Sequence, residues 1–307
     1  MISIFLKGLA MGAANVIPGV SGGTIALITG IYERLINAIR RCDLSAAKLL
    51  LSGKPGAAWA HVDGTWLSVL LGGVAISIVT LARLFEFLLE HYERYTMAFF
   101  FGLILISVLY VARGVSQWGP SVIISLIIGT SIAIAIATLA PASENDGMLY
   151  VFLCGVIAIS SMILPGLSGS FVLILMGNYA LVLGAISTFD LGILIPLAVG
   201  CAAGLIVFSH ILAWVFKRYA DQTLALMTGF VIGSLVVIWP WKEAVVATVA
   251  RVGKPPREII TSYEWFIPSA FSVETYVAVA LMLVGAFCIA MMERFAQGDS
   301  RQSSSKD

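Results

Sequence analysis

Charged side chains are scarce in this chain: 11% of its 307 residues are Asp, Glu, Lys or Arg, whereas a soluble domain usually carries about 25%. Alternation of apolar and polar residues with a period of two is absent, which argues against an outer-membrane barrel. The net charge of +1 gives no sign of nucleic-acid binding. Because 60% of the residues are apolar and lie in long blocks, the composition predicts a helical membrane protein.

Cysteines are also few, and their spacing matches no metal motif. The chain has four of them, and three lie inside apolar blocks: Cys42, Cys154, Cys201 and Cys288. We therefore predict no metal site and no cofactor.

The long apolar blocks each approach the ~20 residues that a helix needs to cross a bilayer. They predict spans at 66–89, 96–114, 119–140, 191–216, 222–240 and 273–293. The first 14 residues are also apolar, but Lys7 lies in their middle, which is wrong for a removable signal sequence. The polar end, 298–307, is predicted to be disordered.

An internal repeat divides the chain. Segment 18–23, Pro-Gly-Val-Ser-Gly-Gly, matches segment 165–170, Pro-Gly-Leu-Ser-Gly-Ser. Outside these segments the matched pairs follow in order: Gly8 with Gly155, Gly30 with Gly177, Tyr32 with Tyr179, Gly73 with Gly200, Tyr92 with Tyr219, and Gly102 with Gly229. The repeat predicts two halves, 1–146 and 147–297, followed by the tail.

Proline and glycine break the helix at the centre of each motif. The arms on either side of the first break, 2–17 and 21–36, are each too short for a full crossing. We predict re-entrant hairpins at 2–39 and 150–186, each followed by three transmembrane helices. A hairpin starts and ends on one side, so three crossings place the second hairpin on the opposite face. The fold class is thus an all-α polytopic membrane protein with two inverted-topology repeats.

The distribution of Lys and Arg predicts orientation, since cytoplasmic loops carry an excess of them. With the N-terminus inside, most basic residues lie on the cytoplasmic side, whereas loop 241–272 holds most of the contrary charges. We predict that both termini lie in the cytoplasm.

The two broken segments are the candidate binding site. A helix that starts after a break has unpaired N–H groups and a partial positive charge, which favour an anion. Breaks at matching positions of two halves point to a transport site. The candidates are Asn15, Pro18, Gly19, Ser21, Gly22, Gly23, Thr24, Pro165, Gly166, Ser168, Gly169 and Ser170. The alternative is that these small residues merely allow tight helix packing.

Two helix ends supply roughly +1 charge, whereas a phosphate monoester carries about −1.5 to −2, so a basic side chain should assist. Arg83 is the first candidate, because it lies inside an apolar span. His210 occupies the matching position in the other half, and Glu33 with Arg34 could gate the cavity. Arg83 could instead extend to the membrane surface or pair with Glu86. His210 could be a neutral interior histidine, and Glu33 and Arg34 could anchor a helix end at the membrane interface.

The chain resembles the PopT-type bacterial membrane family over about residues 3–293. Two runs carry the resemblance, one from Lys7-Gly8 through Asn15 and Pro18 to Tyr32-Glu33, the other from Leu164-Pro165 to Asn178-Tyr179. Members of that family are regarded as undecaprenyl phosphate translocases. The resemblance implies a transporter, not an enzyme, that returns this lipid carrier from the outer to the cytoplasmic leaflet for reuse in cell-envelope synthesis. It also implies that the protein lies in the bacterial inner membrane. Membrane lipids are further partners, and a homo-oligomer is compatible with the sequence.

A rival interpretation is an enzyme. Segment 18–24 also resembles the Pro-Gly-x-Ser-Arg-Ser motif of undecaprenyl pyrophosphate phosphatases, and Glu86 with Glu90 resembles their Glu-x-x-x-Glu pair. Gly22 and Gly169 stand where those enzymes have the arginine that holds transition-state charge. A transporter of another anion and a scaffold without transport also stay open.

Overall fold

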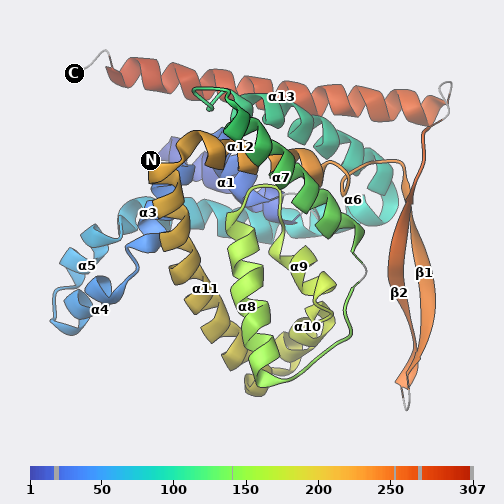
Figure 1. Ribbon diagram of the computed structural model, residues 1–307, viewed down its shortest axis with the longest axis horizontal. Coiled ribbons are helices and arrows are strands. Elements are labelled where there is room, and N and C mark those ends of the chain that lie inside the picture. The colour runs from blue at the N-terminus through green and yellow to red at the C-terminus, as the bar shows by residue number, and fades with distance from the viewer. Residues whose placement is uncertain (17–20, 140, 252–253, 269–271, 305–307) are drawn as a thin grey trace.

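Helices make up most of the computed structural model, which describes residues 1–16, 21–139, 141–251, 254–268 and 272–304 (Figure 1). Within these ranges, five helices are long and apolar enough to cross a membrane, and a bent pair makes a sixth. The prediction of a helical polytopic membrane protein is confirmed.

The first half begins with three short helices, α1 (Ile2–Val16), α2 (Gly22–Ile28) and α3 (Tyr32–Arg40). The polar connection contains α4 (Leu44–Leu51) and α5 (Pro55–His61), which we did not predict. Then come α6 (Gly64–Ala112) and α7 (Pro120–Thr138). The segment α6 consists of two helices joined by a kink at Tyr92, whose φ and ψ are −137° and 35°. Its two candidate spans, Gly64–Leu81 and Phe87–Ala112, correspond to the predicted spans 66–89 and 96–114.

The second half repeats this order with α8 (Met148–Ile163), α9 (Gly169–Leu175), α10 (Tyr179–Thr188), α11 (Leu191–Arg218), α12 (Ala220–Ser234) and α13 (Val273–Ser304). The predicted span 222–240 is too long, because α12 ends at Ser234 and the chain turns before Pro240. Proline disfavours a helical residue ahead of it. Helix α13 continues into 298–304, where we expected disorder.

Both hairpins bend a second time, at Gly30 and Gly177. We expected 21–36 to form one arm, but Gly30 separates α2 from α3 with a φ of 70°, and Gly177 separates α9 from α10 with a φ of 74°. This left-handed conformation favours glycine, which lacks a Cβ. In the second hairpin, the bend at Gly177 turns α10 by 114° relative to α9.

Loop 241–272 contains an antiparallel hairpin that we did not predict. Strands β1 (Lys242–Arg251) and β2 (Lys254–Trp265) pair in register from Lys242 opposite Trp265. Their sequences are rich in β-branched residues, which favour strands. The hairpin extends away from the helices near the start of α13 (Figure 1).

Glycines at matching positions make the same close helix contacts in both halves. A Cβ on Gly8 would lie 2.2 Å from the Leu70 carbonyl oxygen, where α1 crosses α6. One on Gly155 would lie 2.4 Å from the Leu197 oxygen, where α8 crosses α11. Since small residues let helix backbones approach, each pair is held at this distance by its glycines.

The third long helix of each half packs on the other half. A Cβ on Gly285 of α13 would lie 2.0 Å from the Phe99 oxygen of α6, and one on Gly129 of α7 would lie 2.2 Å from the Leu226 oxygen of α12. Helix α13 therefore packs along the second part of α6, and α7 packs along α12. The two halves are interlocked rather than placed side by side.

The largest buried cluster lies where the first hairpin meets both halves. It includes Ile25 of α2, Tyr32 of α3, Leu70 and Ile104 of α6, and Met227 of α12. The first hairpin is thus part of the core, and its position relative to the second motif is set by packing.

Candidate functional site

The two Pro-Gly-x-Ser-Gly segments touch each other directly. The Ser21 hydroxyl donates to the Leu164 carbonyl oxygen at 3.4 Å, and the Gly166 N–H donates to the Thr24 hydroxyl at 3.0 Å. Ser21 and Thr24 are 3% and 1% exposed, so these bonds are shielded from solvent. Pro18 and Gly19 lie outside the described residues. The sequence placed the motifs at matching positions, and the structure adds that they meet.

The start of α2 is capped by side chains of the first hairpin itself. The Gly22 N–H donates to Asn15 Oδ1 at 2.8 Å, and the Gly23 N–H donates to Ser21 Oγ at 3.1 Å. The Thr24 N–H donates to the Ser21 carbonyl oxygen at 2.9 Å. Asn15 thus satisfies a freed backbone group. In this conformation these N–H groups are already paired and do not point at an anion.

The start of α9 differs from that of α2. Ser168 makes no capping bond there, and its hydroxyl lies 2.8 Å from that of Ser170 instead. Pro165 and Gly169 are buried, whereas Ser170 is exposed. Gly166 has a φ of 82°, and a Cβ on it would lie 2.6 Å from the Phe230 carbonyl oxygen. The second motif is therefore tightly packed at its glycines and open at its serines.

The matched tyrosines after the two motifs also differ. Tyr32 is 2% exposed, and its hydroxyl donates to the Ile163 carbonyl oxygen at 2.9 Å. Its ring packs against Phe216 with 5.8 Å between ring centroids. Tyr179 is 36% exposed. The first hairpin is closed against the other half through its tyrosine, and the second is not.

Among the described charged candidates, the bonded partners of Arg34 and His210 lie outside the two motifs. Arg34 Nε donates to Asp63 Oδ2 at 2.7 Å, and its guanidinium lies 4.8 Å from the centroid of the Trp66 ring. Arg34 therefore has an acidic and an aromatic partner at the start of α6. Glu33 is exposed on α3. His210 is exposed on α11, where its Nδ1 bonds the Ile206 oxygen of the same helix at 2.8 Å.

Arg83 lies on α6, but its side chain is outside the described residues, as is that of its possible partner Glu86. Its role therefore stays a prediction. Sequence reasoning passed over Lys7, whose ammonium donates to the Thr29 carbonyl oxygen at 2.8 Å, at the end of α2. Lys7 is a charged residue inside an apolar helix, and the matching position of the second half is Cys154. A charge in such a helix is a sequence feature that could have identified Lys7 as a candidate.

A separate polar cavity of about 410 Å³ lies at the break in α6. It is lined by residues around Tyr92, by the start of β1 and by Glu274 of α13. Arg94 bonds Glu274 at 2.6 Å, and burial lowers the pKa of Lys242, which the charge of Glu93 partly opposes. Because carboxylates outnumber bases in this cavity, it does not suit a phosphate. No cluster suited to a metal ion occurs among the described residues.

A family profile described as undecaprenyl phosphate translocase-like matches residues 11–255. A Vibrio cholerae protein named polyprenyl-phosphate transporter is 42% identical over 299 residues, covering 96% of this chain and 97% of the relative. A Staphylococcus aureus protein of the same name is 34% identical, covering 76% of this chain and 85% of that relative. No solved structure matches the chain significantly.

Proposed function

Since this chain belongs to the undecaprenyl phosphate translocase-like family, we propose that it transports polyprenyl phosphate and moves this lipid from the outer to the cytoplasmic leaflet. The relatives are named transporters, which favours transport over the phosphatase interpretation. The observation that carries the proposal is the meeting of two broken-helix motifs from the two halves of a helical membrane protein. Irregular backbone at membrane depth is tolerated where it is buried in protein or lines a cavity.

The repeat is proposed to have inverted topology. The matched glycine contacts and the matched backbone breaks at Tyr92 and Tyr219, both with a φ of −137°, support a duplicated unit. An odd number of crossings between the hairpins would place them on opposite faces. Accessibility of cysteines placed at Ser45 and Asn145 tests this. We expect outside labelling only at position 145, and outside labelling at position 45 contradicts the topology.

The unequal hairpins support a proposal of alternation between two states. In inverted-repeat transporters, one repeat moves against the other around a central site. We propose that the closed contact of Tyr32 with Ile163 is exchanged, in a second state, for the matching contact of Tyr179 with the carbonyl oxygen of Val16. Ser170, which is exposed here, would then become buried as Gly23 is now.

Labelling of a cysteine at position 170 tests this exchange. Removing one hydrogen bond shifts a two-state equilibrium by about 1 kcal/mol, or roughly fivefold. Tyr32→Phe should therefore slow labelling by destabilising the present state, and Tyr179→Phe should speed it. Changes in the same direction for both variants contradict the exchange.

Arg83 remains our proposed ligand for the phosphate. Because the start of α2 is capped internally, the helix ends neutralise less of the head group than two free ends would, which increases the need for a base. Glutamine at position 83 should abolish binding of polyprenyl phosphate. Lysine should keep part of the binding, because lysine retains the charge but cannot donate two parallel hydrogen bonds as a guanidinium does. Unchanged affinity in Arg83→Gln would exclude this role.

Reconstituted vesicles test the function itself. Polyprenyl phosphate in the outer leaflet is cleaved by an external phosphatase, and lipid that has crossed is protected. We expect a protected fraction that grows with time only when the protein is present. Protection no faster than in empty vesicles contradicts transport. Release of inorganic phosphate from polyprenyl pyrophosphate by the protein alone would support the phosphatase.

A further inference from the structure

The connection between the first hairpin and α6 forms a small two-helix unit, α4 with α5. The two helices pack on each other, and their buried residues are Ala46 and Ala58, which are 8% and 4% exposed. The unit projects from the other helices beside α3 (Figure 1). Two residues separate its last turn at His61 from Gly64, where the membrane-spanning part of α6 begins. The unit therefore lies next to a membrane surface.

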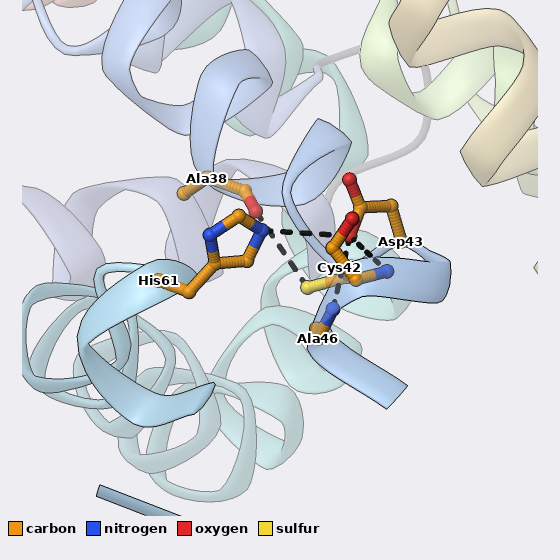
Figure 2. A network of polar contacts seen from close by, with 6 residues as sticks. Ala38, Cys42, Asp43, Ala46 and His61 are labelled. Atoms are coloured by element: carbon orange, nitrogen blue, oxygen red, sulfur yellow. Dashed lines mark hydrogen bonds and ion pairs between the residues drawn. The ribbon is translucent and has the colours of Figure 1, made fainter. Parts of the chain in front are cut away.

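Asp43 holds the two helices of the unit together. Its carboxylate accepts the N–H of Ala46 at 3.0 Å, which caps α4, and lies 3.4 Å from Nε2 of His61 at the end of α5. Figure 2 shows Asp43 between these two partners. The contact with His61 is an ion pair when that ring is protonated. Asp63, the other acidic residue of this connection, pairs with Arg34.

The face turned away from the Ala46 contact is apolar. At 100° per residue, Leu44, Ala47 and Leu51 lie on one side of α4, opposite Ala46. Leu44 is 80% exposed and Leu51 is 89% exposed. Trp59 of α5 is half exposed, packs against Gly64 and donates to the Thr65 hydroxyl at 2.9 Å. Exposed leucines beside a tryptophan are typical of a helix that lies in a membrane interface.

Basic residues lie within the unit and directly before it in the chain. With both acids of the connection already paired, the remaining charges are positive, and none of them pairs with a carboxylate among the described residues: Arg40, Arg41, Lys48 and Lys54. An excess of basic residues beside inserted apolar side chains complements anionic lipid head groups.

We propose that α4 and α5 form a surface unit that binds anionic lipids of the adjacent leaflet, with Leu44 and Leu51 inserted among the acyl chains. By the predicted topology this is the cytoplasmic leaflet, but the proposal does not rest on the transport function. A spin label tests it. The label is placed at position 51 in a variant whose native cysteines are replaced by alanine, and the protein is reconstituted into phosphatidylglycerol or phosphatidylcholine vesicles.

In phosphatidylglycerol, the label should be shielded from a water-soluble nickel quencher and accessible to oxygen. In phosphatidylcholine it should be exposed to the quencher. Each basic residue near an anionic surface favours association roughly fivefold, so Lys48→Gln with Lys54→Gln should shift insertion about 25-fold. Lys217→Gln with Arg218→Gln removes the same charge at the exposed end of α11 and should have no effect. A label at Asp146 should be accessible in both lipids.

Equal accessibility of position 51 in the two lipids overturns the proposal, whether the label is exposed in both or shielded in both. Equal shielding combined with spin–spin broadening between labels would identify a second copy of the chain as the occupant of this face. Because the substituted lysines are exposed, the variants should fold, and thermal melting checks this directly.

Discussion

Replacing Thr24 by valine should weaken the junction between the two motifs. The valine keeps the shape of the side chain but removes the oxygen that accepts the Gly166 N–H at 3.0 Å. A buried donor left without a partner costs about 1–3 kcal/mol, which is about five- to 150-fold in an unfolding equilibrium. Hydrogen bonds between membrane helices average only about 0.6 kcal/mol, because a freed group often finds another partner.

The larger value applies here because Gly166 has little freedom to turn. It lies in the left-handed region, and the backbone of Phe230 packs against it. Thr228→Val provides a matched control, since Thr228 is equally buried but donates to the Leu224 oxygen of its own helix. That carbonyl keeps its helical N–H partner, so we expect a loss below about 1 kcal/mol.

Unfolding by SDS in mixed micelles, followed by tryptophan fluorescence, measures both variants. Thr24→Ser, which keeps a hydroxyl, should recover most of the stability that Thr24→Val loses. Equal losses for Thr24→Val and Thr228→Val would refute the reasoning, because the bond across the motifs would then contribute no more than one within a single helix.

Other positions give further expectations. Gly166→Ala should abolish transport at normal insertion, because of its φ of 82° and the nearby Phe230 oxygen, whereas Gly184→Ala, with open space around it, should be neutral in the vesicle assay. Ser21→Ala should reduce transport only modestly, by the ~1 kcal/mol of a hydrogen bond, and complete loss would favour a nucleophile. The pKa of Asp43 is lowered, chiefly by the Ala46 N–H. Its cap on α4 is therefore fully present above its unfolded pKa, near 4, and is lost as pH falls through the lower folded value. Hydrogen exchange at Ala46 should accelerate over that range, and Asp43→Asn should remove the dependence.

Much of the architecture could be predicted because proline and glycine have distinctive effects on the backbone conformation. The breaks after Val16 and Ile163 were predicted from the motifs, and the matched glycines aligned the two halves. The second bend at Gly30 was missed, because an isolated glycine in an apolar run reads equally well as a packing residue. Its positive φ shows only in three dimensions.

The contacts across the motifs could not be read from the sequence. The Tyr32 hydroxyl bonds a backbone oxygen 131 positions away, and any residue could supply that oxygen. The partner of Arg34 could not be predicted for a related reason. Arg34 was noted for its place at the hairpin end, but its partner Asp63 lies beyond a connection whose fold was not predicted. The untested prediction, Arg83, rests on depth in the membrane alone.

The interlocked packing of the long helices has a consequence for biosynthesis. Helix α7 is synthesised long before α12, the helix it packs on. The second part of α6 is likewise synthesised long before its partner α13. The glycine-lined surfaces of the first half therefore stay open to lipid until the second half has been inserted. A ribosome stalled after α7 would leave a fragment that lacks both the α7–α12 contact and the α6–α13 contact. Two halves expressed as separate chains would have to associate before quality-control proteases degrade them.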